Sequence, residues 1–543
     1  MTPTVSITTD TGELDTLLTT IRSFLEADIM ELVVDGRKVS GFRTPDASSL
    51  WIRDHCDMLR IGRYFHPDAT SVVEHFAETQ SATGRIFDYF TTFPEKLPCE
   101  RENWTKYVRV PVEADVEYRF VKAAWLAWQA CGDDEWLRRM LPAMDRALEY
   151  ILNNPWYFDE GMGLIKRAYT IDTWDFAYTA GEHEWLQFQI DDNTFWGIMH
   201  GDNSGYLEAF RIMARVYRHL GHDPGSDEGV ERAGEWRDRA ALWDERADRL
   251  RERMNEVCWN GDFYTHFVKL SEVEIPGVDE AAQLSLSNPM DINRGAATHE
   301  MAVAIIEEYR RRRETTGAFA EWFSVDPPFP DGIFGDEKLV GGAYVNGGIM
   351  PLVGGELARA ALEHGYEAYG VDILRQYLGM ISGSGETYLW YFPDGTPASV
   401  ETSTSPEASA TDGWGSSAML YALIEGVAGV EDEHRSFERI RLSPRWEAAG
   451  VARAEVELEY AGSGSGFGYT YEKSDGEIGL ELTGRASPVT CHVLLPGESG
   501  VTSVRQGDEE LEFTGVTVEA SRYVDFIISD PGAGAVTIAY SAV

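Results

Sequence analysis

The chain has 543 residues and a formal net charge of −44, from 91 acidic residues against 47 lysines and arginines. Such a charge repels nucleic acids and anionic membranes, so the composition argues against both as partners. No apolar run approaches the roughly 18 residues that a membrane-spanning helix needs. At this length we expect one large domain and an accessory domain.

The acidic residues are spread along the chain and lysines are few, which is typical of proteins from a salt-rich cytoplasm, where ions screen self-repulsion. The alternative is an ordinary acidic enzyme. The first residues, "MTPTVSITTDTGELD", lack the basic and apolar regions of a secretion signal. The five cysteines are scattered without a CxxC pair, which indicates neither a disulfide framework nor a zinc site. We expect a cytoplasmic, halophilic protein with no metal and no cofactor, and the pattern favours no particular oligomeric state.

Residues 1–44 form an N-terminal segment, and a helical body is expected over 45–432. "VEADVEYRFVKAAWLAWQACG" at 112–132 and "DEWLRRMLPAMDRALEYILNN" at 134–154 have apolar residues at helical spacing, with Pro142 expected to kink or split the second. Further helices are predicted at 70–90, 203–220, 230–256, 297–316, 347–365, 367–382 and 414–429. No repeat of about 34 or 40 residues is present, so the pattern favours helical hairpins in a ring or solenoid over tetratricopeptide or HEAT arrays.

After Pro444 the pattern changes to alternating segments such as "ARAEVELEYAG", "EIGLELTG" and "AVTIAYSAV". This alternation predicts an antiparallel β-sandwich over 433–543. Between the helices lie long loops at 155–202, 324–346 and 383–414, rich in Trp, Asp, His and Gly. Loops of this length and composition indicate a functional site.

In "YTIDTWDFAY" at 169–178, Asp172 and Asp175 flank Trp174, and Phe176 follows. Burial among rings raises the pKa of a carboxyl group, which keeps it protonated as the general acid of glycoside hydrolysis must be. A second carboxylate must stay ionised to activate water. We therefore take Asp175 as the candidate acid. The alternative is that Asp172 caps a turn and the rings belong to the core.

"LWIRDHCDML" at 50–59 places Trp51, Arg53 and Asp54 at the start of a predicted helix. An Arg–Asp pair here is either a buried structural pair or a fork that hydrogen-bonds two sugar hydroxyls.

Five segments, in the same order, resemble (α/α)6 glycosidases over roughly 50–430. "WIRDHCDM" resembles the W-x-R-D segment of glucoamylases, glycogen debranching enzymes and processing α-glucosidases, and the stretch beginning "VEADVEYRF" resembles a helical pair of debranching enzymes. "TWDF" is similar to T-W-M-D of those enzymes and to W-D-F of trehalases, in which the aspartate is the general acid. "HGDNSGYLEAF" and "DGWGSSAMLYALIEG" resemble their later sugar-lining helices.

The resemblance implies a mainly α fold, an (α/α)6 toroid, and an inverting hydrolase of α-linked, glucose-containing oligosaccharides. It implies Asp175 as the acid and sugar contacts from Arg53, Asp54 and Asp115. Related enzymes carry the base just after the penultimate toroid helix, which favours Glu386. The distance from Glu386 to Trp414 is longer than is usual in the family, so Glu401 and Glu407 remain rivals for that role.

Aromatic and polar residues of the loops complete the expected sugar pocket: Trp51, Trp174, His200, Asp202, Tyr344, Asn346 and Trp414. Two alternatives stay open. A sugar epimerase on the same toroid would need paired histidines, for which His183, His200 and His299 are available. A non-catalytic carbohydrate-binding protein would lack one or both carboxylates. Two carboxylates about 6.5–9.5 Å apart across one pocket would favour the inverting hydrolase.

Overall fold

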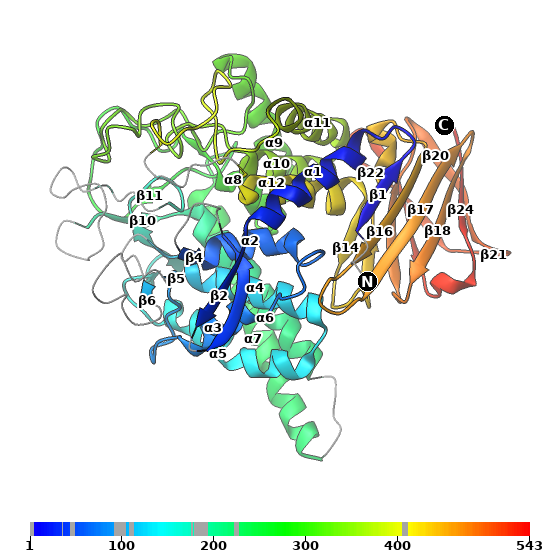
Figure 1. The fold of residues 1–543 in the computed structure, drawn as a ribbon, viewed down its shortest axis with the longest axis horizontal. Helices are drawn as coiled ribbons and strands as arrows, with labels where there is room; N and C mark the ends of the chain where they lie inside the picture. Colours follow the sequence, from blue (N-terminus) through cyan, green and yellow to red (C-terminus); the bar gives the residue numbers. More distant parts are fainter. Residues whose placement is uncertain are drawn as a thin grey trace.

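The computed structural model describes residues 5–34, 36–43, 49–91, 105–107, 113–174, 178, 194–221, 227–403 and 411–542. A helical body adjoins a C-terminal part made of strands (Figure 1). The chain starts with β1 (Ser6–Thr9), α1 (Glu13–Ala27), β2 (Ile29–Val34) and β3 (Arg37–Phe42).

Six helices of the described residues, called the ring helices below, contact one another in cyclic order. Each packs against the next, and the last packs against the first. They are α2 (Ile52–Gly62), α4 (Val116–Cys131), α6 (His200–Leu220), α8 (Ser287–Asn293), α10 (Pro351–Glu363) and α12 (Gly413–Tyr421). α12 continues as a π-helical turn over Ala422–Val427. All eleven residues of α2 are buried, as expected of a helix that is enclosed on every side.

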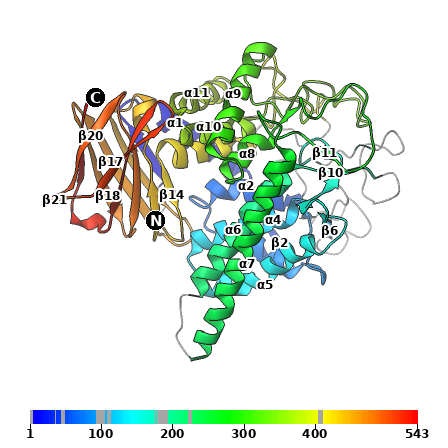
Figure 2. The same cartoon turned by 180° about the vertical axis from the view of Figure 1, so that it is seen from behind.

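A second set of helices packs against the ring helices from α4 to α10. They are α3 (Ser71–Glu78), α5 (Asp134–Leu152), α7 (Asp227–Cys258), α9 (His299–Thr316) and α11 (Glu367–Ser384). α7 is the longest described helix and extends beyond the rest of the body (Figure 2). α1 packs against α12, α11 and α2.

Glycines allow the ring helices to approach closely. A Cβ atom on Gly205 of α6 would overlap the ring of Tyr118 on α4, and one on Gly355 of α10 would overlap the backbone of Ala418 on α12. Helix pairs in contact at such positions are fixed in register, because no larger side chain fits.

The helix predictions are largely confirmed, with three corrections. Helices at 203–220, 230–256, 297–316 and 367–382 are present with ends shifted by a few residues. The helix predicted at 70–90 ends at Glu78, and Pro142 does not split α5, which runs unbroken through it. α8 was not predicted, because its seven residues lie within a segment without helical periodicity.

The C-terminal part contains two sheets. One has described strands in the order β1-β16-β17-β18-β24-β20-β21, and the other β14-β15-β19-β23-β22. The main strands are β14 (Val430–Asp432), β15 (Ile440–Leu442), β16 (Arg453–Glu459), β17 (Gly466–Ser474), β18 (Glu477–Gly484), β19 (Val489–Leu494), β20 (Ser499–Gln506), β21 (Glu509–Glu510), β22 (Phe513–Val518), β23 (Ser521–Ile528) and β24 (Val536–Ala542). The sheets contact each other through β20, which packs against β22 and β23.

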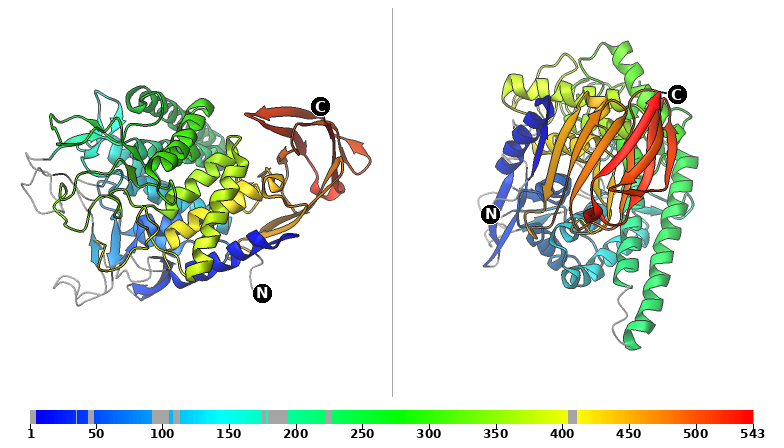
Figure 3. Two further views of the ribbon diagram at one scale, coloured as in Figure 1. Left: turned by 90° about the horizontal axis from the view of Figure 1, so that it is seen from above. Right: turned by 90° about the vertical axis from the view of Figure 1, so that its right-hand side faces the viewer.

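Two strand pairings differ from expectation. β15 and β19 run parallel, whereas an antiparallel arrangement was predicted. β1 pairs with β16, so the N-terminal segment supplies a strand to the C-terminal sheet. Residues 6–27 thus join the helical body to the sheets along one flank of the molecule (Figure 3).

None of the helices in the described ranges combines the length and apolar character that a membrane span requires. Within the same ranges, no three His, Cys, Asp or Glu side chains are grouped so that they could hold a metal ion.

Candidate active site

Three aromatic rings meet near the start of the ring helices. Trp174 lies with its ring centroid 5.3 Å from that of Tyr344 and 5.3 Å from that of Trp414, the second residue of α12. The ring centroid of Trp390 lies 6.4 Å from that of Tyr344. Segments far apart in the chain thus form one aromatic cluster, which is the kind of surface that stacks on the apolar face of a sugar. Trp51, at the start of α2, instead contacts Tyr89, with the ring centroids 4.0 Å apart and the ring planes tilted by 34°.

The loop that carries Trp174 is anchored by its backbone. The Trp174 carbonyl accepts hydrogen bonds from Arg167 Nη2 at 2.8 Å and from the Thr170 hydroxyl at 3.1 Å. Arg167 is fully buried and pairs with Asp202 at 3.2 Å. The residue before the predicted acid is therefore held from two directions. Asp175 itself lies outside the described residues, as does Phe176.

Asp172 is the turn residue of this loop. It has a left-handed backbone with φ of 48°, and its carboxylate accepts from the Thr173 amide at 2.7 Å and the Ser287 hydroxyl at 2.5 Å. Burial alone would raise the pKa of Asp172, but the neighbouring His200 and the hydrogen bonds from Ser285 and Ser287 lower it overall. A carboxylate that stays ionised and is hydrogen-bonded inside the protein is a poor general acid, so this geometry favours the turn-cap reading of Asp172.

Arg53 pairs with Asp115 rather than with Asp54. Its Nη2 lies 2.7 Å from Asp115 Oδ1 at the start of α4, and 3.5 Å from Glu113 Oε1. The adjacency of Arg53 and Asp54 in the sequence was misleading, because successive residues of a helix point about 100° apart.

Asp54 instead belongs to a group of three buried carboxyls with Asp28 and Asp412. Asp28 is 1% exposed, and neither of its carboxyl oxygens has a hydrogen-bond partner among the described residues. Burial and then the charges of Asp412 and Asp54 raise the pKa of Asp28 to about 10. Burial raises the pKa of Asp412 to about 6, although it caps α12 by accepting from the Gly415 amide. A Cβ atom on Gly413 would overlap Asp28, so a glycine is needed there.

Asp57 links the aromatic cluster to the interior of the ring. Trp414 donates from Nε1 to Asp57 Oδ2 at 2.7 Å, and Arg119 Nη1 lies 2.5 Å from each oxygen of the same carboxylate. Although burial opposes it, Arg119 holds the pKa of Asp57 below its usual range. Neither Asp28, Asp57 nor Asp412 was selected from the sequence. Asp412 could have been found from "DGW", because an aspartate directly before a predicted helix is a candidate helix cap.

Of the candidate bases, Glu386 has the more suitable environment. It is half-buried, and its Oε2 atom is shielded from solvent without a hydrogen-bond partner in the described structure. The neighbouring Thr387 contacts the Tyr377 hydroxyl at 2.7 Å, which contacts Ser416 of α12 at 2.9 Å. This places the start of the 385–392 segment against the helix that carries Trp414. Glu401 is exposed, and Glu407 lies outside the described residues.

Three predicted sugar contacts are instead occupied within the protein. His200 Nδ1 lies 2.5 Å from Asp291 and its Nε2 lies 3.0 Å from the Ser285 hydroxyl. The Asn346 side-chain amide accepts from the Phe329 backbone N–H and donates to the backbone carbonyls of Phe329 and Leu339. Asp202, paired with Arg167, is fully buried.

Of the histidines considered for an epimerase, His200 and His299 do not contact each other and have separate partners. His299 begins α9 and contacts His364 and Glu519, away from the aromatic cluster. His183 lies outside the described residues.

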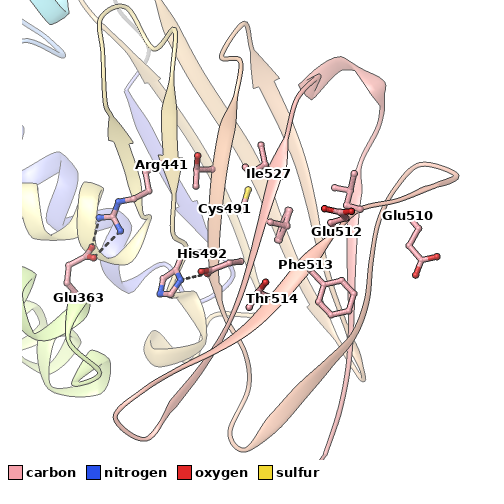
Figure 4. Close-up of a pocket in the computed structure, with 13 residues that line it drawn as sticks. Glu363, Arg441, Cys491, His492, Glu510, Glu512, Phe513, Thr514 and Ile527 are labelled. Atoms are coloured by element: carbon pink, nitrogen blue, oxygen red, sulfur yellow. Dashed lines mark hydrogen bonds and ion pairs between the residues drawn. The ribbon is translucent and has the colours of Figure 1, made fainter. Parts of the chain in front are cut away.

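A separate cavity of about 1250 Å³ lies on the C-terminal part (Figure 4). Arg441 and Glu363 pair at one edge of it at 2.9 Å, and His492 lies 2.6 Å from Asp525. The described lining of this cavity includes Phe513 and Phe526 but neither Trp nor Tyr. The Trp and Tyr rings that characterise the site at the ring helices are therefore not part of it.

No family model matches the chain, and a search of curated proteins found no match. Solved structures do match. The chain is similar to the GH78 family rhamnosidase of Bacillus sp. GL1, with a TM-score of 0.55 and 16% identity, covering 88% of this chain and 41% of that protein. It is similar to the α-L-rhamnosidase of Streptomyces avermitilis, solved with L-rhamnose, with a TM-score of 0.56 and 14% identity over 98% of this chain and 42% of that protein. It is similar to the α-L-rhamnosidase of Dictyoglumus thermophilum, with a TM-score of 0.57 and 12% identity over 99% of this chain and 50% of that protein.

These likenesses concern the fold. The chain shares it along nearly its whole length, and spans half or less of the length of the three proteins it matches.

Proposed function

We propose that this chain is a glycoside hydrolase with an (α/α)6 toroid and a C-terminal β-sandwich. The observation that carries the proposal is the aromatic cluster of Trp174, Tyr344 and Trp414 at the start of the ring helices, with Asp175 directly after Trp174. The cyclic contacts of the ring helices and the fold shared with α-L-rhamnosidases support it.

In the proposed reaction, Asp175 protonates the glycosidic oxygen and Glu386 activates a water molecule on the opposite face of the sugar ring. The anchored Trp174 carbonyl supports the first role, because a general acid must be held within hydrogen-bond reach of its proton acceptor. Glu386 Oε2 has no hydrogen-bond partner among the described residues, which supports the second role, because a base must accept a proton from water. Attack from the opposite face inverts the anomeric centre.

Arg53 and Asp115 are proposed to border the sugar as one charged pair, with Asp54 beside them. Arg53 is 5% exposed and Asp115 is 1% exposed, so both side chains are held in place by their surroundings. A sugar hydroxyl that reaches the pair would therefore bind to groups whose orientation is already fixed.

The proposed substrate is an α-linked oligosaccharide. The sequence resemblance favours a glucoside, and the shared fold makes an α-L-rhamnoside the second choice. Purified protein in molar KCl would be assayed on trehalose, kojibiose, maltose, isomaltose and an aryl α-L-rhamnoside.

Paired substitutions test the mechanism. Asp175→Asn keeps the shape of the side chain and removes the transferable proton, so kcat is expected to fall by about 10²- to 10⁴-fold. The loss should shrink with aryl or fluoride glycosides, whose leaving groups need less protonation. Glu386→Gln should depress all substrates alike, and Glu401→Gln, at an exposed position, is the matched control.

Proton NMR of the first product should show the inverted anomer. Nearly full activity of Asp175→Asn on a natural disaccharide would contradict the acid assignment, and a retained anomer would contradict the inverting mechanism. Saturable sugar binding without hydrolysis of any substrate would favour the non-catalytic alternative.

A further inference from the structure

A second cavity, of about 330 Å³, lies where the ring helices end. Its lining includes residues from every ring helix or the turn directly after it. Asp54, in the first turn of α2, is near the aromatic end, and Arg63, directly after α2, lines this cavity. The two residues are nine positions apart, or about 14 Å along a helix axis. The cavity is therefore at the other end of the ring from the proposed sugar site.

The described lining is rich in cations, although the whole chain has a net charge of −44. Arg60, Arg63 and Arg359 are buried in its wall, and Lys122, Arg211, Arg215 and Arg294 also line it. Its acidic residues are Glu208, Glu425, Glu431 and Asp432.

The acids of the lining are already occupied. Glu208 pairs with Lys122 at 2.9 Å, Glu425 with Arg359 at 3.0 Å, and Glu431 with Arg441 at 2.8 Å. Asp432 accepts from the Tyr460 hydroxyl and two backbone amides.

Some cations of the lining have no close carboxylate. Arg211 pairs with Asp244 and Asp248 on α7, and Arg60 pairs with Glu356. By contrast, Arg63 and Arg215 have no carboxylate within ion-pair distance among the described residues, and Arg63 donates from Nη1 to Gln129 Oε1 at 2.7 Å. Arg294 comes no nearer to a carboxylate than 3.9 Å and donates from Nη1 to the Gly201 carbonyl and the Ser204 hydroxyl.

Three guanidinium nitrogens of the wall lack an acceptor. They are Arg60 Nη2, Arg63 Nε and Arg359 Nε, each shielded from solvent and without a hydrogen-bond partner in the described structure. Their residues are 3%, 2% and 7% exposed. A buried donor without an acceptor is costly, and the three arginines that carry these donors all line this cavity. Together with the excess of cations over acids in the lining, they point to a ligand that supplies acceptor oxygens.

Helix capping does not account for this charge. Cations near the end of a helix stabilise its carbonyl groups, and Arg60 is placed for that role in the last turn of α2. Lys122 of α4 and Arg211 and Arg215 of α6 lie in mid-helix, beyond the range of that effect.

We propose that this cavity binds a small phosphate-type oxyanion, either free phosphate or the phosphate group of a sugar-sized metabolite. Guanidinium groups match the oxygens of phosphate with paired hydrogen bonds. The volume suits a small ligand and is at the lower end for ligand pockets, which span about 300 to 1,000 Å³. The site is independent of the proposed hydrolase activity.

Calorimetry tests the proposal on the full chain, at the lowest KCl concentration that keeps it folded and at constant ionic strength. The probes are inorganic phosphate, a hexose 6-phosphate and the same hexose without phosphate. Saturable binding of phosphate or the hexose phosphate is expected. Tighter binding of the hexose phosphate would identify a metabolite, and equal binding would identify free phosphate.

Arg215→Glu reverses an exposed charge of the lining, and Arg139→Glu on α5 is the matched control, exposed and without an ion pair among the described residues. Arg215→Glu should weaken phosphate binding by about tenfold or more, whereas Arg139→Glu should leave it unchanged. Arg63→Gln, which removes a buried donor, should weaken it as well if circular dichroism shows the variant folded. Absence of phosphate binding in the wild-type protein, or equal losses in Arg215→Glu and Arg139→Glu, would overturn the proposal.

Discussion

Asp28→Asn is expected to stabilise the protein, and by more as the pH rises. The pKa of Asp28 is raised from 3.8 to about 10 by burial and by Asp412 and Asp54. Between these values the folded protein holds a proton that the unfolded chain releases, so stability falls with rising pH by about 1.4 kcal/mol per unit. At pH 7, about three units above the unfolded value, the cost is about 4 kcal/mol. Asparagine needs no proton and has nearly the same shape, so the variant avoids this cost.

Urea unfolding of wild type and variant at pH 5, 6, 7 and 8, at constant KCl, measures the effect. The gain should be about 1.5 kcal/mol at pH 5 and about 4 kcal/mol at pH 7. Asp475→Asn, in the exposed turn between β17 and β18, is the control and should change stability by less than about 0.5 kcal/mol. A gain that is the same at every pH, or a variant less stable than wild type at pH 7, would refute the reasoning.

The remaining predictions concern salt, the charged pair and helix packing. The thermal midpoint should rise between low and molar KCl, because ions screen the repulsion of a chain with a charge of −44, and a flat midpoint would argue against halophily. Arg53→Lys should lower kcat/KM while the protein stays folded, because lysine cannot reproduce the contacts to Asp115 and Glu113. A loss of soluble protein, with normal specific activity in the part that remains soluble, would indicate that the pair is purely structural. Gly205→Ala should destabilise the protein by about 1–3 kcal/mol in thermal unfolding, since the added methyl overlaps Tyr118, and an unchanged midpoint would show that α4 and α6 can separate freely.

The helices that could be predicted are those whose apolar residues recur over several turns, such as α5 and α6. α8 could not, because a helix of seven residues shows too few turns for a period to be recognised. The pairing of β1 with β16 could not be predicted from the sequence either. It places Ser6 opposite Glu457, and no local pattern specifies a partner so far along the chain.

For the candidate site, the sequence predicted types of residue better than their partners. Trp174, Tyr344 and Trp414 were selected as loop aromatics and do meet in one cluster. The partner of Arg53 was wrong, because a neighbour in sequence is not a neighbour across a helix. Asp28 was missed because its role depends on α1 packing against α12, which contact only in the folded chain.

The interior of the ring explains how cations can gather in so acidic a chain. Four buried arginines each pair with an acid from another element of the ring: Arg53 with Asp115, Arg119 with Asp57, Arg60 with Glu356, and Arg359 with Glu425. Three of these pairs join adjacent elements, and the Arg60–Glu356 pair joins α2 to α10 across the ring. Such pairs add little net stability, because desolvation offsets their attraction, but a wrong neighbour would leave a charge buried alone. They therefore help to specify which ring helix lies beside which.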